Sequence, residues 1–264
     1  WYFSALSDSI GQAFNEKFFN SKTSLYGTDD TYQTYQLIAL TGDLVPAEHR
    51  QAVINTIIKD LNKRKNHLNT GIIGTKYLWP TLVNSGQGNL AFEVAKQTTY
   101  PSYGYWLKNG STTLLEEWSG ANSHNHQMFG SISEYFYKYL AGIWSPMENN
   151  TSVGYKHVHL QPFVPDSLKS VKASLETVSG TVVSDWKKEE GSFSYHVSIP
   201  ANTTGTVIIP VFGENSVLSE GGITIWEKGA FEDGVAGITT VKKESDRLML
   251  TIESGEYEFE LKEE

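Results

Sequence analysis

The hydrophobic pattern of this chain changes its period once, and that change limits the folds open to it. Up to about residue 145, apolar side chains recur every three or four positions, the spacing of one helix face. From about residue 155, apolar and polar residues alternate, which is typical of half-buried strands. A polar segment, 145–154, separates the two patterns. The sequence therefore predicts a helical domain over 1–145 and a β-domain over 155–264, and 264 residues are enough for two cores.

The first half contains six segments with helical spacing. The first, over 4–19, is amphipathic, with an apolar face made of Leu6, Ile10, Ala13, Phe14 and Phe18. The other helices are expected over 31–40, 46–61, 76–84, 90–97 and 126–140, the last with a stripe of Phe129, Ile132, Phe136 and Leu140. Turns marked by Gly or Pro separate them, so we expect stacked antiparallel helical hairpins.

Strand-like segments with Gly, Pro and Asn turns between them fill the second half, at 157–162, 192–199, 205–210, 247–252 and 257–261. Short antiparallel strands at such intervals predict a β-sandwich. His157 and His159 alternate along one strand, so they face the same side of the sheet, as surface or domain-interface residues.

Composition excludes several classes of partner. A formal net charge of −9 argues against nucleic acid, and no apolar run is long enough to predict a membrane span. The chain has no cysteine, which removes disulfides and zinc–thiolate sites. It begins with Trp1 and has no leader-like segment, so we expect a processed product or a piece of a longer protein.

Three segments at helix junctions carry the candidate chemistry, namely 66–75, 100–118 and 122–127. Loops on a rigid scaffold often hold binding and catalytic residues. The second combines five aromatic side chains with Glu116 and Glu117, as a sugar-cleaving cleft would. Glycoside hydrolysis needs two carboxylates on opposite sides of the scissile bond, so at most one of this adjacent pair is catalytic. From the residues alone, the favoured interpretation is that both are solvated charges at a helix start.

Histidines in the same segments favour hydrogen bonding over metal binding. His124 and His126 with His67 form only a weak metal pattern, because no Asp or Cys cluster accompanies them. Hydrogen bonding to a substrate hydroxyl, or a place near a helix N-cap, is the better interpretation. We expect no cofactor and no metal site.

Together these segments resemble a known family. Thr70–Leu78, Gln97–Tyr105, Gly110–Trp118 and Ser123–Gly130 are similar, in the same order, to motifs of the bacterial α-L-rhamnosidases of glycoside hydrolase family 78. The second half resembles the C-terminal β-domain of that family through 199–207 and 254–259. The resemblance implies an inverting hydrolase with an (α/α)6 barrel followed by a β-sandwich, acting on a rhamnose-containing oligosaccharide or glycoside.

The resemblance also implies roles for individual residues. Alignment of the family pattern on Trp118 makes Glu116 the general base, with Glu117 at the place of an Arg or another polar residue and Leu115 replacing an aromatic residue. Substrate contacts are expected from a set of aromatic and histidine side chains: His67, Tyr103, Tyr105, Trp118 and His126.

One part of the family pattern has no counterpart. An (α/α)6 barrel needs about twelve helices, and the family's general acid comes from a segment that would lie upstream of Trp1. We therefore expect a partial barrel whose apolar helix faces meet the missing N-terminal part. Two alternatives remain open, a non-catalytic carbohydrate-binding protein on a degenerate glycosidase fold and a six-hairpin glycosidase for another sugar.

Overall fold

A computed structural model describes residues 2–27, 33–146, 150–213 and 215–263. The chain divides into two compact units, Trp1–Ser133 and Glu134–Glu264. None of the described helices combines the length and the hydropathy that a membrane crossing requires. The predicted linker 145–154 lies partly outside the described residues, and its role as the domain boundary stays a prediction.

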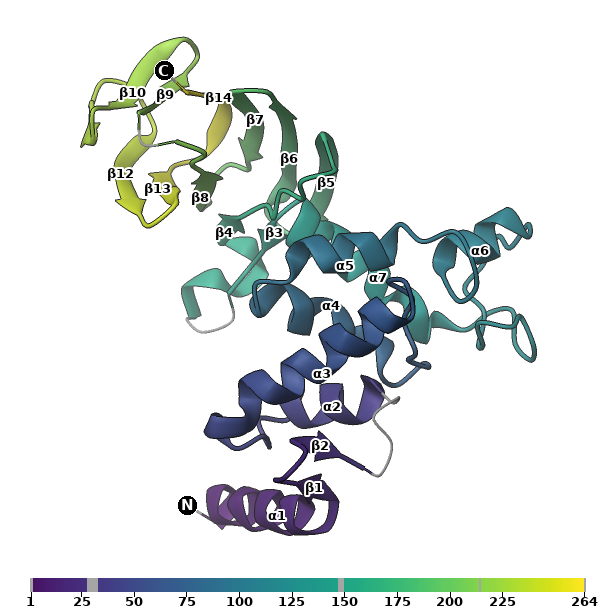
Figure 1. Cartoon of the computed structure of the whole chain (residues 1–264). Coiled ribbons are helices and arrows are strands. Elements are labelled where there is room, and N and C mark those ends of the chain that lie inside the picture. Colours follow the sequence, from purple (N-terminus) through teal and green to yellow (C-terminus); the bar gives the residue numbers. More distant parts are fainter. Residues whose placement is uncertain (1, 28–32, 147–149, 214, 264) are drawn as a thin grey trace. The chain divides into compact units, whose positions relative to one another are not determined.

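Helices form the first unit, with one short hairpin of strands β1 and β2 (Figure 1). All but the last of the predicted helices are present within a few residues of the expected bounds, although residues 31 and 32 are not described. The elements are α1 Tyr2–Phe18, β1 Phe19–Asn20, β2 Leu25–Tyr26, α2 Gln33–Thr41, α3 Arg50–Lys63, α4 Thr75–Asn84, α5 Gly88–Ala95 and α6 Tyr103–Lys108. A 3-10 turn, Ala47–His49, precedes α3.

Helices α2 to α5 pack on one another around a buried core of aliphatic side chains. Its members include Leu37, Val53, Ile57, Leu61, Leu78, Leu82 and Val94. By contrast, α1 has no buried residue, and the apolar face predicted for it is largely open, with Ile10 58% exposed. Only its C-terminal end packs, where Phe14 lies against Tyr26 of β2.

The sequence did not predict α6, because half of its residues are aromatic and its six residues are too few to show a period. The hydroxyl of Ser102 caps it by accepting the backbone N–H of Tyr105 at 3.0 Å. Gly104 lets α6 approach the preceding segment closely, since a Cβ there would lie 2.4 Å from the carbonyl oxygen of Gln97.

The predicted helix 126–140 is wrong as one regular helix. It divides into a 3-10 turn, Gln127–Gly130, then α7, Ser131–Glu134, and a π-helical segment, Tyr135–Leu140. Phe129, Ile132 and Leu140 of the expected stripe are buried, but Tyr135 is buried in place of Phe136, which is 46% exposed.

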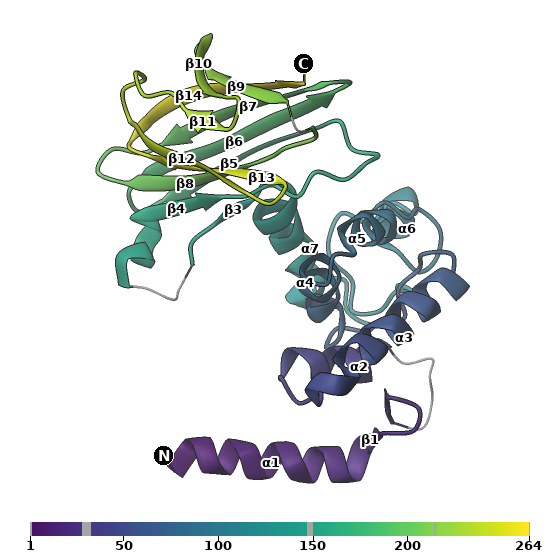
Figure 2. The same ribbon diagram turned by 60° about the vertical axis from the view of Figure 1, so that its left-hand side comes forward.

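Two stacked sheets form the second unit, which confirms the predicted β-sandwich (Figure 2). One sheet has the order β11-β10-β9-β14-β7-β6-β5 and the other β12-β13-β8-β4-β3. Among the described strands, only β4 and β8 pair in parallel. The strands are β3 Ile143–Trp144, β4 His157–Leu160, β5 Ser170–Thr177, β6 Gly180–Glu189, β7 Ser192–Ile199, β8 Thr204–Pro210, β9 Ser216–Glu220, β10 Ile223–Glu227, β11 Ala230–Phe231, β12 Ile238–Glu244, β13 Arg247–Ile252 and β14 Gly255–Glu263.

The alternation of apolar and polar residues along the strands matches the alternation of buried and more exposed side chains. In β4, Val158 and Leu160 are buried in the sandwich core while His157 and His159 face away from it. The two imidazole rings lie 5.1 Å apart between centroids, so they share one side of the sheet as predicted. Burial lowers the pKa of both histidines, and for His159 the neighbouring charge of His157 adds to the effect.

Candidate active site

Segment 113–126 forms a hairpin-like loop that carries both candidate carboxylates. At its neck the backbone N–H of His126 donates to the carbonyl of Leu114, and the N–H of Glu116 donates to the carbonyl of Ser123, both at 2.9 Å. These bonds bring the two ends of the loop together. Glu116 and His126, which are ten positions apart in the chain, thereby become neighbours.

The carboxylate of Glu116 is held through one oxygen. Its Oε2 accepts the backbone N–H of Ser123 at 3.1 Å, and Nδ1 of His126 lies 3.9 Å from the same atom. The Glu116 side chain is 33% exposed, so solvent reaches it. Among the described residues, the partners of this carboxylate all contact Oε2, which leaves Oε1 available to a water molecule or a sugar hydroxyl.

Glu117 has different surroundings. Its Oε1 accepts the side-chain amide of Asn122 at 2.6 Å, and its Oε2 accepts the hydroxyl of Ser119 at 3.2 Å. Both of its oxygens are thus used within the tip of the loop. The two adjacent carboxylates are therefore not equivalent, because only Glu116 keeps an oxygen free beside a histidine.

A cluster of aromatic rings supports this loop. Trp118 stacks on Trp106 with centroids 4.4 Å apart, and Phe129 and Tyr103 contact the same indole at 4.4 and 5.1 Å. The indole N–H of Trp118 donates to the carbonyl of Thr70 at 2.6 Å. Trp118 is only 9% exposed, so its main contacts are with the protein. The substrate contact expected of it stays a prediction.

Tyr103 and Tyr105 lie on α6, beside this cluster. The hydroxyl of Tyr103 donates to the carbonyl of Phe129 at 2.7 Å, and burial raises the pKa of Tyr103, so the phenol stays protonated. Tyr105 is half-buried and packs edge-on against the exposed ring of Tyr100, with centroids 5.4 Å apart. Of these residues, Tyr100, which is 55% exposed, presents the most accessible aromatic surface.

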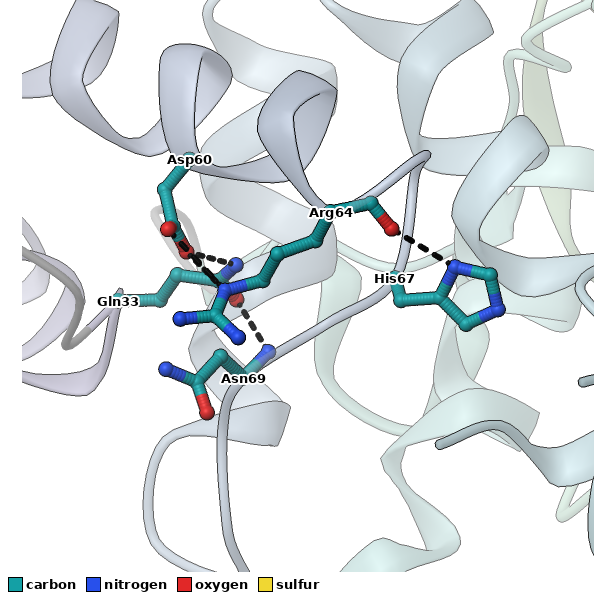
Figure 3. Close-up of polar contacts among 5 residues, drawn as sticks. All are labelled: Gln33, Asp60, Arg64, His67 and Asn69. Carbon is teal, nitrogen blue, oxygen red and sulfur yellow. Dashed lines mark hydrogen bonds and ion pairs between the residues drawn. The ribbon is translucent and has the colours of Figure 1, made fainter. Parts of the chain in front are cut away.

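Both ring nitrogens of His67 are occupied. Nδ1 donates to the carbonyl of Arg64 at 2.9 Å, as Figure 3 shows, and Nε2 lies 2.8 Å from the hydroxyl of Thr99. The carbonyl contact places the proton on Nδ1, so Nε2 of the neutral ring accepts from Thr99. His67 thus ties the end of α3 to the segment before α6, and its expected sugar contact stays a prediction.

Sequence reasoning missed a buried polar cluster beside His67 (Figure 3). Asp60, 6% exposed, binds Nε of Arg64 at 2.9 and 3.1 Å and accepts the side-chain amide of Gln33 at 2.8 Å. The other end of Gln33 accepts the backbone N–H of Asn69 at 2.9 Å. The cluster fastens segment 66–75 to α2 and α3. The spacing of Asp60 and Arg64, four residues apart on one helix, is the signal that could have found it.

The three predicted segments are thus brought into contact at defined points. Segments 100–118 and 122–127 meet at the loop neck, and segment 66–75 joins them through Thr70 and Trp118. Among the described residues, no hydrogen bond or ion pair links His67 to Glu116 or His126.

Metal binding finds no support in the described part of the chain. It contains no group of three His, Cys, Asp or Glu side chains that could hold an ion. His124 instead lies with Nε2 2.9 Å from the carbonyl of Gly120, a contact within the loop.

A helical unit with an acidic loop over an aromatic cluster, followed by a β-sandwich, is the architecture of a six-hairpin glycosidase with its C-terminal domain. Residues 1–140 match the model of the bacterial alpha-L-rhamnosidase 6 hairpin glycosidase domain, and residues 145–224 match that of the bacterial alpha-L-rhamnosidase C-terminal domain. The chain belongs to the bacterial alpha-L-rhamnosidase family.

Individual relatives agree with this assignment. An alpha-L-rhamnosidase of Formosa agariphila is 29% identical over 98% of this chain and 28% of its own length. The structure of alpha-L-rhamnosidase from Dictyoglumus thermophilum superposes with a TM-score of 0.85 at 34% identity, covering 99% of this chain and 29% of that one. That of Streptomyces avermitilis, complexed with L-rhamnose, superposes with a TM-score of 0.82 at 27% identity, over 98% and 24%. The chain thus spans less than a third of the length of these relatives.

Proposed function

We propose that the full-length protein to which this chain belongs hydrolyses terminal α-L-rhamnosyl linkages with inversion, and that Glu116 is its general base. The observation that carries the proposal is the carboxylate of Glu116, 33% exposed, whose Oε2 accepts the N–H of Ser123 beside His126 while Oε1 stays free. The relatives are alpha-L-rhamnosidases by name, and one of them was solved with L-rhamnose.

In this mechanism a water molecule sits between Oε1 of Glu116 and the anomeric carbon of the rhamnosyl ring. Glu116 takes a proton from the water as the water attacks, and the glycosidic bond breaks on the opposite face. The leaving oxygen receives a proton from a second carboxyl group, which in inverting enzymes stands roughly 6.5–9.5 Å from the base. Glu117 cannot fill this position, because both of its oxygens are hydrogen-bonded in the loop tip.

His126 is placed to orient the sugar. It lies beside the proposed base and is 24% exposed, so its ring can meet a sugar hydroxyl. Tyr105 and the neighbouring Tyr100 offer ring surface for the apolar face of a pyranose. Tyr103 contacts Phe129 and Trp118 contacts Trp106, and these contacts support the segments that carry His126 and Tyr105.

We assign the general acid to polypeptide outside the 264-residue sequence, since the chain spans less than a third of the length of its relatives. The open face of α1 is the surface on which that part would pack. Its exposed apolar side chains include Phe3, Leu6 and Ile10. Beside its C-terminal end lies a cavity of about 400 Å³ lined by Phe14, Phe18, Tyr26, Gly27, Tyr35 and Ile38. Apolar surface of this extent usually marks an interface.

The test is the Glu116→Gln variant of the full-length protein, assayed on nitrophenyl α-L-rhamnoside. Loss of a general base lowers turnover by a factor of about 10²–10⁴. The Glu117→Gln variant is the matched control, and a far milder effect is expected because an amide oxygen can still accept from Asn122. Near-normal turnover of the Glu116 variant would refute the assignment.

A panel of nitrophenyl glycosides on the unsubstituted full-length protein separates the alternatives. Release of nitrophenol from the rhamnoside alone supports the proposal. Release from a different glycoside points to a six-hairpin enzyme for another sugar. Rhamnose binding in calorimetry without any release points to a carbohydrate-binding protein.

A further inference from the structure

Glu116 and Ser123 are joined twice. The backbone N–H of Glu116 donates to the carbonyl of Ser123 at 2.9 Å, and the N–H of Ser123 donates to Oε2 of Glu116 at 3.1 Å. The direction of the Glu116 carboxylate therefore depends on where the loop holds the backbone of Ser123. Whatever fixes the loop tip also fixes the group that would activate the water.

The neighbouring residue on each side of this pair is joined as well. Glu117 follows Glu116, Asn122 precedes Ser123, and their side chains share the 2.6 Å hydrogen bond. Asn122 lies in the left-handed region with φ of 62°, which asparagine adopts more readily than most other residues besides glycine. A hydrogen bond to an ionised carboxylate is stronger than one between two neutral groups. The bond from Asn122 to Glu117 can therefore hold the loop tip in this conformation.

We propose that Glu117 and Asn122 form a clamp that positions the general base. The clamp closes the loop tip, keeps the N–H of Ser123 aimed at Oε2 of Glu116, and so keeps Oε1 directed at the substrate. Glu117 and Asn122 are positioning residues, since neither touches the reacting atoms. The inference rests on the proposed function of Glu116, and it gives Glu117 a role in the place where the family resemblance implies an Arg or another polar residue.

The test compares four variants of the full-length protein on nitrophenyl α-L-rhamnoside. Glu117→Ala and Asn122→Ala each remove the clamp, and each is expected to lower kcat about tenfold with little change in KM, the size expected for one lost hydrogen bond to a charged group. Glu117→Gln removes the same charge but keeps an acceptor, so it should rescue most of the activity. The double alanine variant should lose no more than either single variant, because both act through one contact.

Two controls keep the outcome interpretable. Glu176 is another exposed glutamate that accepts a side-chain hydroxyl, from Thr181 at 2.8 Å, and Glu176→Ala should leave kcat unchanged. Hydrogen exchange of the peptide covering 114–126 should be faster in Glu117→Ala than in the Gln variant. Losses that multiply in the double variant, or unchanged kcat and exchange in both alanine variants, would overturn the clamp. If instead Glu116→Gln keeps normal turnover while exchange responds as expected, the general-base assignment fails and the clamp remains as a structural contact.

Discussion

At the residue scale, hydrogen bonding distinguishes the two adjacent carboxylates. Oε2 of Glu116 is bound by a backbone N–H seven residues later, and Glu117 by an amide five residues later. Two neighbouring glutamates in a sequence carry no sign of this difference. The family resemblance selected Glu116 by its distance from Trp118, whereas the physical reason lies in the closed loop. The roles of both residues stay predictions until turnover is measured.

Asp60 is expected to matter for stability. Replacing it by Ala leaves the amide of Gln33, which is 1% exposed, without its acceptor and removes the partner of Arg64. Since Arg64 is itself partly exposed, we expect a loss of about 2 kcal/mol in unfolding free energy rather than the full value of a buried pair. A fall in the denaturation midpoint of the helical unit measures it. Glu93→Ala, which removes a more exposed ion pair with Lys96, should change the midpoint little; an equal fall would contradict the prediction.

At the element scale, hydrophobic periodicity predicted regular helices and strands well, but it did not predict segments with irregular backbone. The predicted helices in 4–97 and the five predicted strands are present because their apolar faces are several turns or pleats long. The sequence did not predict α6, the irregular winding of 126–140, or several described strands, among them β5, β6, β9, β10 and β12. Helix α6 is too short to show a period, and 126–140 contains a π segment with Tyr135 buried in place of Phe136. Such windings depend on packing partners that sequence periodicity does not record.

The open face of α1 leads to an element-scale prediction. Ile10→Lys places a charge on the face proposed to pack against the rest of the barrel. We expect a loss of about 1–2 kcal/mol in unfolding free energy, so the melting temperature of the full-length protein should fall by several degrees. Gln12→Lys adds the same charge on the opposite side of the helix, four residues from Glu16, and should have little effect. Equal melting temperatures for both variants would contradict a packed face.

Strand β4 predicts a dependence of stability on pH. Burial lowers the pKa of His157 and His159 below the unfolded value of about 6.5, so the folded state binds fewer protons there. The stability of the β-sandwich that depends on neutral His157 and His159 should be fully present above pH about 6.5. It should be lost as the pH falls through the pKa values of the folded state. His159→Phe preserves a ring beside Trp144 and removes one titrating group. Thermal melts between pH 7.5 and 5 should show a smaller decline in this variant, and an unchanged decline would count against the histidines.

At the scale of the whole molecule, the proposed reaction needs more than this chain supplies. Inverting hydrolysis requires two separated carboxyl groups, and the relatives are more than three times as long as the region matched here. The 264-residue chain alone is therefore expected to release no nitrophenol from the rhamnoside, while the full-length protein does. Assays at equal molar concentration check this. Full turnover by the 29.5 kDa chain would refute an external general acid.

The sequence by itself determined the two kinds of architecture, the positions of five described helices and five described strands, and the family, because hydrophobic period and short motifs are local properties of a chain. Only the tertiary structure decided how the segments 66–75, 100–118 and 122–127 contact one another, and that Trp118 is packed beneath the loop. It alone revealed that the backbone of Ser123 binds Glu116 whereas the side chain of Asn122 binds Glu117. Hydrogen bonds between residues far apart in sequence depend on backbone closure, and closure is a property of the folded chain.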